Sequence, residues 1–143
     1  MKQLLLFLLV TLNFSLTAQT EDYSGTYVFL IEGKDGNILD YKMQLNPDGT
    51  FIFTSFQRVV DIRGNHDTHK NSKGIWKVEN KIIKFSSEPN DLDKDYPLNF
   101  NGTTARVIKK SPRDKSDKLV PTALQFYKSE ISTIANLKFL LKE

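Results

Sequence analysis

The feature that most constrains the fold is a tight turn at 46–49, with the sequence Asn-Pro-Asp-Gly, between two segments of alternating character. Proline at the second position of such a turn and glycine at the last are typical of a type I turn that closes a hairpin with a bulge. Before the turn, apolar and polar residues alternate from Tyr41 to Leu45, which is the period of a strand with one face in water. After it, Thr50 to Phe56 returns with Phe51, Phe53 and Ser55 on one face. The segment therefore predicts an antiparallel β-hairpin.

A second hairpin is predicted over residues 74–85, from the strands Gly74 to Val78 and Ile82 to Phe85 and a short reversal at 79–81. Three further segments are rich in β-branched and aromatic residues and are also predicted as strands: Gly25 to Glu32, Thr103 to Lys109 and Ala123 to Lys128. The apolar positions of residues 130–143 suit either a helix or a strand. Because β-branched Ile131 and Ile134 disfavour a helix, a short turn followed by a strand is expected there.

Together these segments predict an all-β chain, an antiparallel up-and-down meander of about eight strands. Such a meander forms a barrel or a half-barrel, and closure into a barrel removes its exposed edges. In a barrel of about eight strands the interior is either filled by side chains or just wide enough for one small ligand. If the interior holds a ligand, the inward-facing residues are the ones that contact it.

Three stretches carry a resemblance to a known group of proteins: Gly25-Thr26-Tyr27, Leu45 to Phe51, and Gly74 to Ile82. They are similar to the successive hairpins of bacterial lipocalin-like (calycin-type) small exported proteins. The run from Lys128 to Lys142 resembles the closing segment of such chains. True lipocalins have Gly-x-Trp where this sequence has Gly-x-Tyr. The resemblance implies a lipocalin-like barrel or half-barrel in which ligand binding is expected more readily than catalysis.

The N-terminus has the pattern of a secretory signal peptide. Lys2 supplies a positive charge, Leu4 to Val10 is an unbroken apolar run, and Ala18-Gln19 offers a cleavage site after a small residue. Residues 1–18 are therefore predicted to be removed, which leaves a single domain at 19–143. The apolar stretch is shorter than the roughly 20 residues that span a bilayer, so no stable membrane anchor is expected. The protein is expected to be exported, either to the periplasm or out of the cell.

The composition excludes several kinds of site. The sequence contains no cysteine, so it has no disulfide, thiolate zinc site, cysteine nucleophile or lipidated cysteine. The net charge is only +3, and the basic stretch from Lys109 to Lys118 holds no aromatic residue that would stack on bases. Asp114 and Asp117 interrupt this stretch, which is predicted to be a solvated loop. No nucleic-acid partner and no cofactor are therefore expected, and the oligomeric state is left open.

The one cluster with metal-ligand chemistry is His66-Asp67-Thr68-His69, with Asp61 close by in the sequence. Two imidazoles and a carboxylate suit zinc or copper. The polar residues at 63–65 and 70–74 predict that the histidines lie in a flexible, solvated hairpin loop without fixed geometry. A metal site is therefore not expected.

Neither a calcium loop nor a catalytic motif can be assigned. Residues 91–95 carry alternating carboxylates like the start of an EF-hand loop, but Tyr96 stands where that loop needs glycine and Gly102 where it needs glutamate. They are predicted to form a polar connector. No serine lies in a Gly-x-Ser-x-Gly elbow, and both histidines lie in one predicted loop. No catalytic residue is assigned, and the protein is not expected to be an enzyme.

Six aromatic residues point into the barrel if the strand registers hold: Tyr27, Tyr41, Phe51, Phe53, Trp76 and Phe85. Ordinary core packing is one interpretation of them, and an apolar pocket with a polar tip is the other. On the second interpretation, the candidate ligand-binding residues are Tyr27, Tyr41, Phe53, Trp76 and Arg106. Arg58 or Arg106 would meet a ligand carboxylate, although Arg106 equally suits the outward position of its strand.

Two functions are consistent with this sequence. The first is an exported lipocalin-like domain that binds a small apolar or amphipathic ligand in the barrel interior. The alternative is a non-catalytic structural or protein-interaction module of the cell envelope, with a filled barrel. A cavity of about 300 Å³ or more, open at one end and lined by the aromatic residues, would favour binding.

Overall fold

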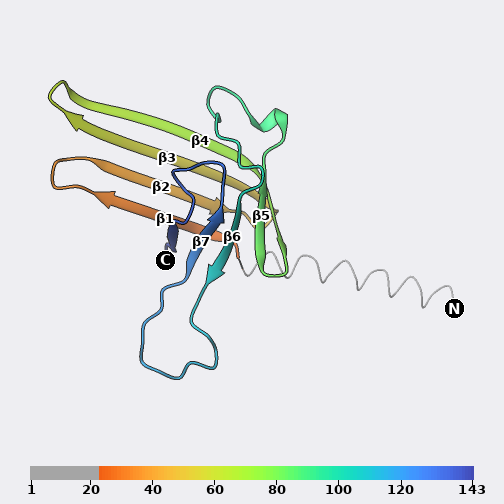
Figure 1. The fold of residues 1–143 in the computed structure, drawn as a ribbon. Coiled ribbons are helices and arrows are strands. Elements are labelled where there is room, and N and C mark those ends of the chain that lie inside the picture. The colour runs from red at the N-terminus through yellow and green to blue at the C-terminus, as the bar shows by residue number, and fades with distance from the viewer. Residues whose placement is uncertain (1–22) are drawn as a thin grey trace.

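The computed structural model describes residues 23–143, whose strands form a closed antiparallel barrel (Figure 1). Each strand pairs with its neighbour in sequence, and the last strand pairs with the first. The elements are β1 (Gly25–Glu32), β2 (Ile38–Leu45), β3 (Thr50–Asp61), β4 (Gly64–Glu79), β5 (Ile82–Ser86), the 3-10 helix η1 (Pro89–Asp91), β6 (Thr104–Ile108), β7 (Ala123–Lys128) and β8 (Lys138–Leu141). The predicted all-β, up-and-down fold is confirmed. The predicted signal peptide at 1–18 lies outside the described residues.

Because neighbouring strands are antiparallel, the connections alternate between the two ends of the barrel. We call the end that holds the β1–β2, β3–β4, β5–β6 and β7–β8 connections the mouth, and the opposite end the base. In Figure 1 the long β6–β7 loop hangs below the barrel, whereas the β5–β6 and β7–β8 connections lie above it. The barrel therefore has two ends that are formed by different connections.

The turn between β2 and β3 has the predicted geometry. Gly49 has a φ of 86°, and its N–H donates to the carbonyl of Asn46 at 3.1 Å. Asp48 Oδ1 accepts a hydrogen bond from the backbone N–H of Thr50 at 2.9 Å. A type I turn followed by a left-handed glycine fixes the register of the hairpin.

The reversal predicted at 79–81 is a two-residue turn. Asn80 has a φ of 51° and Lys81 a φ of 64°, so both are left-handed. This is the conformation of a type I′ turn, whose twist matches that of the strands on either side. Both hairpins that the sequence predicted are therefore present, with β4 and β5 paired between 75–79 and 82–86.

Aromatic rings fill the barrel between the base and the mouth. The six aromatic residues that were predicted to face inward are each at most 3% exposed, which confirms their orientation. Three more phenylalanines, Phe100, Phe126 and Phe139, are fully buried among them. The ring centroids of Phe53 and Phe100 lie 5.1 Å apart, and those of Phe126 and Phe139 lie 5.0 Å apart. The interior is thus packed, as in other small barrels whose side chains fill the available space.

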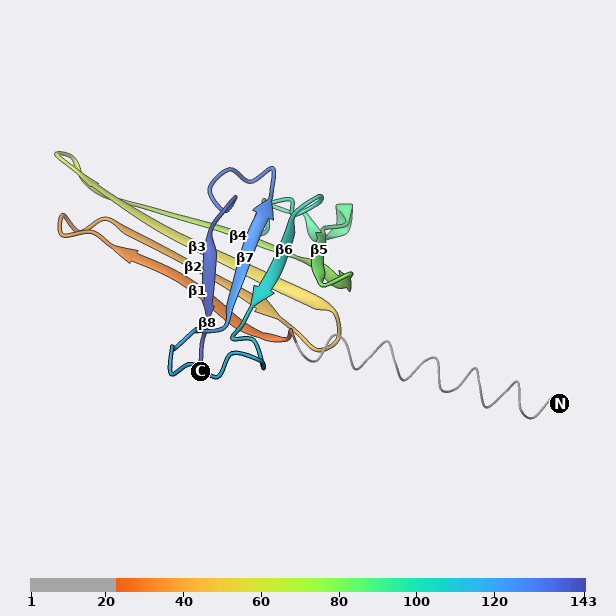
Figure 2. The ribbon, with the colours of Figure 1, turned by 60° about the horizontal axis from the view of Figure 1, so that its bottom comes forward.

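Four strands continue past the barrel as a projecting sheet, which we call the arm (Figure 2). It consists of residues 29–32, 38–41, 55–61 and 64–71. Side chains two residues apart on a strand share a face, so Ser55 and Gln57 lie on the same face as buried Phe53. One face of the arm is therefore a continuation of the inner surface of the barrel.

The prediction of a flexible loop around His66 and His69 was wrong. β3 runs to Asp61 rather than ending at Phe56, and β4 begins at Gly64 rather than Gly74. Residues 64–70 are exposed and polar on both faces of the arm, so they give no period-two hydrophobic signal. Backbone pairing with β3, which runs from Thr50↔Ile75 to Asp61↔Gly64, makes them a strand despite this.

Residues 130–143 form a turn and then a strand, as predicted. The N–H of Ile134 donates to the carbonyl of Ile131 at 3.1 Å, and the N–H of Leu137 donates to the carbonyl of Ile134 at 3.1 Å. Ile134 is fully buried, so it anchors this connection in the core before β8 begins. Among residues 23–143, no helix is long and apolar enough to cross a membrane.

Candidate functional site

A pocket of about 320 Å³ opens at the mouth, where the inner face of the arm meets two connecting segments. Its floor is made by Tyr41 of β2 and Phe53 of β3, which are 3% and 1% exposed. Their rings meet edge to face with centroids 5.7 Å apart. The pocket therefore begins where the packed rings of the barrel end.

The hydroxyl group of Tyr41 is open to this pocket. It makes no hydrogen bond with any residue that the structure describes. No buried side-chain nitrogen or oxygen atom in the described part of the chain lacks a partner, so this oxygen is not sealed in the core. A ring that is almost wholly buried thus keeps its hydroxyl group, a donor and an acceptor, accessible to solvent or to a ligand in the pocket.

The arm supplies a polar wall. Ser55 is the cross-strand partner of Lys70, and Gln57 is the partner of Thr68, so the four side chains form two neighbouring rows on the inner face. Ser55 is half-buried, and the other three are exposed. Because the backbone of each row is fixed by the β3–β4 ladder, the polar groups are held in a set order above the floor.

The opposite wall comes from Leu98 and residues 130–133. The N–H of Leu98 donates to the carbonyl of Asn71 at 3.2 Å, and its own carbonyl accepts from Ser72 Oγ at 2.6 Å. On the β7–β8 side, Ile131 packs against the hydrophobic core of the barrel and Ile134 is fully buried in it. Both segments are therefore tied to the barrel, and the pocket is preformed rather than assembled from free loops.

Two opposite charges stand on the rim of the pocket, at Lys70 and Glu130. Both side chains are exposed, and neither forms an ion pair with another described residue. The apolar floor, the open hydroxyl and the charged rim together suit a molecule with an apolar body and a polar head.

Of the five sequence-predicted ligand-binding residues, only Tyr41 and Phe53 line the pocket. Tyr27 is buried at the base side of Phe29, and its hydroxyl donates to the carbonyl of Tyr23 at 2.9 Å. Desolvation by burial raises the pKa of Tyr27 to about 12. Its hydroxyl is therefore a structural donor.

The other two predicted residues lie away from the pocket. Trp76 is buried, and its Nε1–H donates to the carbonyl of Asn46 in the β2–β3 turn at 3.1 Å. Arg106 is exposed on the outer surface of β6, with its guanidinium 5.5 Å from the ring centroid of Tyr127. Arg58, the alternative partner for a carboxylate, is bound to Asp67 at 2.7 Å. The structure therefore does not bring an arginine to Tyr41 and Phe53.

The two histidines occupy opposite faces of β4, because they are three residues apart on a strand. His66 Nε2 lies 3.2 Å from Asp61 Oδ1, whereas the His69 ring stacks on Phe56 with centroids 4.9 Å apart. Within residues 23–143 no group of three or more His, Cys, Asp or Glu side chains is placed to hold a metal ion. The carboxylates of 91–95 serve local turns instead, as where Asp93 Oδ1 accepts from the N–H of Tyr96 at 2.9 Å.

Comparisons of the chain with protein-family models, with curated proteins and with solved structures give no match. The closed, eight-stranded, up-and-down barrel is consistent with a lipocalin-like fold.

Proposed function

We propose that the protein is a lipocalin-like binding protein that holds a small amphipathic ligand in the mouth pocket. The apolar body of the ligand lies on the rings of Tyr41 and Phe53, and its polar head lies between Lys70 and Glu130, in hydrogen-bonding reach of the Tyr41 hydroxyl group. The observation that carries this proposal is the buried Tyr41 ring with its hydroxyl open to a preformed pocket. A few accessible polar groups beside an apolar floor are what orient a small ligand in a binding pocket, and the Tyr41 hydroxyl is such a group.

The site is at the mouth rather than in the middle of the barrel. Rings from six strands and one connection occupy the interior below Phe53, with neighbouring centroids between 5.0 and 6.4 Å apart. A pocket of about 320 Å³ is at the small end of the range of ligand sites, about 300–1,000 Å³. This size suits a ligand with one ring or one short chain on the floor.

Binding suits these residues better than catalysis. The lining offers hydroxyl, amide, ammonium and carboxylate groups, and neither histidine is among the lining residues. Neither Ser55 nor Ser132 is hydrogen-bonded to Lys70 or Glu130 within residues 23–143, so the lining contains no paired nucleophile and base. The lining residues therefore offer a ligand hydrogen bonds and charge.

Calorimetric titration with three probes tests the proposal: decanoate, decylamine and 3-phenylpropionate. At least one probe should bind, and Tyr41→Phe should weaken its binding by roughly tenfold or more, since a hydrogen bond to a charged head contributes about 1.5–3 kcal/mol. Lys70→Gln should weaken the binding of the two carboxylates, and Glu130→Gln should weaken the binding of the amine. Lys42→Gln is the matched control, because Lys42 lies on the outer face of β2 and does not line the pocket.

Absence of binding by all three probes would contradict the proposal. That result would favour the alternative of a structural or protein-interaction module, for which the filled barrel interior is the supporting observation. The proposal would also be contradicted if Lys42→Gln and Lys70→Gln weakened binding equally. Equal losses would indicate a general charge effect and not binding in the pocket.

A further inference from the structure

The two ends of the barrel carry opposite charge. The connections at the base, residues 46–49, 80–81 and 109–122, contain six lysines and arginines and three carboxylates. The connections at the mouth, residues 33–37, 62–63, 87–103 and 129–137, contain three lysines and arginines and six carboxylates. A molecule with this distribution orients in an electric field or near a charged surface, with its base toward negative charge.

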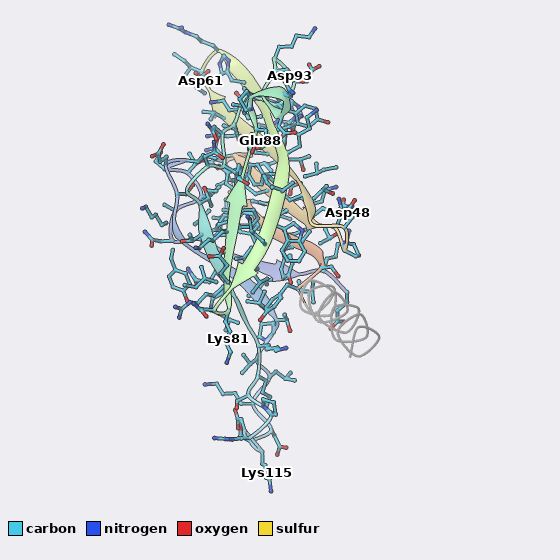
Figure 3. The ribbon with its side chains drawn as sticks, turned by 90° about the vertical axis from the view of Figure 1, so that its right-hand side faces the viewer. Asp48, Asp61, Lys81, Glu88, Asp93 and Lys115 are labelled. Atoms are coloured by element: carbon cyan, nitrogen blue, oxygen red, sulfur yellow. The ribbon has the colours of Figure 1, made fainter. Side chains whose placement is uncertain are left out.

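Five of the six cations at the base lie in one loop, residues 109–122, which we call the basal loop. It is the longest of the base connections and extends well below the barrel, with Lys115 at its far end (Figure 3). None of its cations forms an ion pair within residues 23–143. The positive charge of the loop is therefore available to a partner.

The basal loop is ordered by its own hydrogen bonds. The N–H of Asp114 donates to the carbonyl of Ser111 at 3.0 Å, and Asp114 Oδ1 accepts from the N–H of Ser116 at 2.9 Å. The hydrogen bonds from Ser116 also lower the pKa of the Asp114 carboxyl group. The Nζ of Lys110 donates to the carbonyl of Ser116. One of the two carboxylates of the loop is thus used to fold the loop rather than to neutralise a lysine.

An apolar side chain stands beside these cations. Leu119 is 93% exposed and directly follows Lys118. The loop contains no aromatic residue, so it lacks the stacking groups of a surface that binds single-stranded nucleic acid. Cations with an adjacent exposed aliphatic side chain suit the interface of an anionic bilayer, where the charges meet headgroups and the apolar group enters the acyl boundary.

We propose that the basal loop docks the protein on an anionic lipid bilayer, with Leu119 entering the interface. Because the pocket is at the opposite end, docking leaves the mouth open toward the aqueous side. Each cation near an anionic membrane strengthens binding by roughly fivefold, so the loop gives reversible attachment and not a permanent anchor. The proposal does not depend on what the pocket binds.

Vesicle co-sedimentation tests this with the protein as isolated after export, without added pocket ligand. Vesicles of phosphatidylglycerol and phosphatidylcholine in equal parts should bind the protein, and vesicles of phosphatidylcholine alone should not. Lys115→Glu/Lys118→Glu should reduce binding by at least about 25-fold, from roughly fivefold per cation removed. Leu119→Ser should reduce it by roughly three- to tenfold, since one aliphatic side chain is lost from the interface.

The matched control is Lys34→Glu/Arg63→Glu, which changes the net charge by the same amount at two exposed positions of the mouth connections. It should change binding by less than about threefold, because these residues are far from the membrane when the base is docked. Equal losses from the two double variants would overturn the proposal, as would binding to phosphatidylcholine alone. The proposal would also be overturned if the protein bound dextran sulfate as tightly as vesicles and Leu119→Ser did not weaken vesicle binding. That result would indicate that the basal loop binds an anionic polymer.

Discussion

Arg58 and Asp67 face each other across β3 and β4 and are joined by two hydrogen bonds of 2.7 Å, from Nε and from Nη2 of the arginine. The pair lies on the outer face of the arm, beside the contact between Phe56 and His69. Together with the contact of His66 and Asp61, these two contacts join the side chains of a strand segment that is polar and exposed. The arm in turn carries Thr68 and Lys70 into the mouth pocket.

The first prediction concerns the stability of the arm in acid. The hydrogen bonds from Arg58 lower the pKa of the Asp67 carboxyl group. A carboxyl group with a lowered folded-state pKa stabilises the fold above its ordinary pKa of about 4, and the contribution disappears as the pH falls through the lowered value. Asp67→Asn should therefore reduce amide protection in residues 64–70 at neutral pH. It should also abolish the loss of protection that the unchanged protein shows as the pH falls below about 4. The effect should be small and local, because the pair is partly exposed.

Hydrogen exchange measured by NMR would show this. Asp48→Asn is a useful comparison, because the pKa of that carboxyl group is also lowered, by hydrogen bonds from Thr50, but it lies in the β2–β3 turn at the base. If Asp67→Asn left the protection of 64–70 unchanged, the ion pair would not stabilise the arm.

A second prediction concerns Gly49, whose φ is 86°. A Cβ at this position would lie 3.6 Å from the carbonyl oxygen of Trp76, an ordinary contact, so the cost of substitution comes from the backbone angle alone. Gly49→Val should lower the free energy of unfolding by about 1–2 kcal/mol, and Gly49→Asn should cost much less because asparagine tolerates left-handed φ. Urea unfolding of the two variants measures the difference. Equal stabilities would show that φ is not the constraint.

A third prediction concerns Trp76, which is 2% exposed and packs at the base side of the interior. Trp76→Ala should lower the free energy of unfolding by roughly 3–5 kcal/mol, since it leaves a large cavity and removes one of the two hydrogen bonds that the carbonyl of Asn46 accepts. Because Trp76 does not line the mouth pocket, its fluorescence should not respond to decanoate. A strong change in its emission on adding decanoate would place the ligand in the barrel interior instead.

The N-terminal sequence gives a fourth prediction. Exported protein should begin at Gln19, because the charge of Lys2, the apolar run after it and the small residue Ala18 form one cleavage signal. Edman sequencing or intact mass of the exported protein measures this. Recovery of exported protein that still begins at Met1 would contradict it.

Strands with one buried face were predictable from the sequence, and strands with two wet faces were not. β1 and β7 have the predicted bounds, and the turn at 46–49 set the register of β2 and β3. β2 and β3 alternate on either side of an explicit turn signal, and β1 and β7 are rich in β-branched and aromatic residues. The first half of β4 has neither, since both of its faces lie in water, and only its pairing with β3 makes it a strand.

The same difference explains the site. Tyr41 and Phe53 were found because they belong to alternating strands and face the interior. Thr68 and Lys70 were missed because the segment that holds them was predicted to be a loop and had no register. Ser55 and Gln57 carried a signal that was available, since they continue the inward positions after Phe53. Where β3 ends and whether the arm exists depend on long-range pairing, which alternation alone does not give.

The most direct test of the mouth pocket is an NMR titration of the ¹⁵N-labelled protein with decanoate, which maps where the probe sits. We expect the largest amide shifts on residues 55–57, 68–70 and 130–133, and we expect Tyr41→Phe to reduce them. Residues 46–49 and 76 at the base should not shift. Shifts spread over the base, or no shifts at millimolar decanoate, would contradict the proposal that the mouth pocket is the binding site.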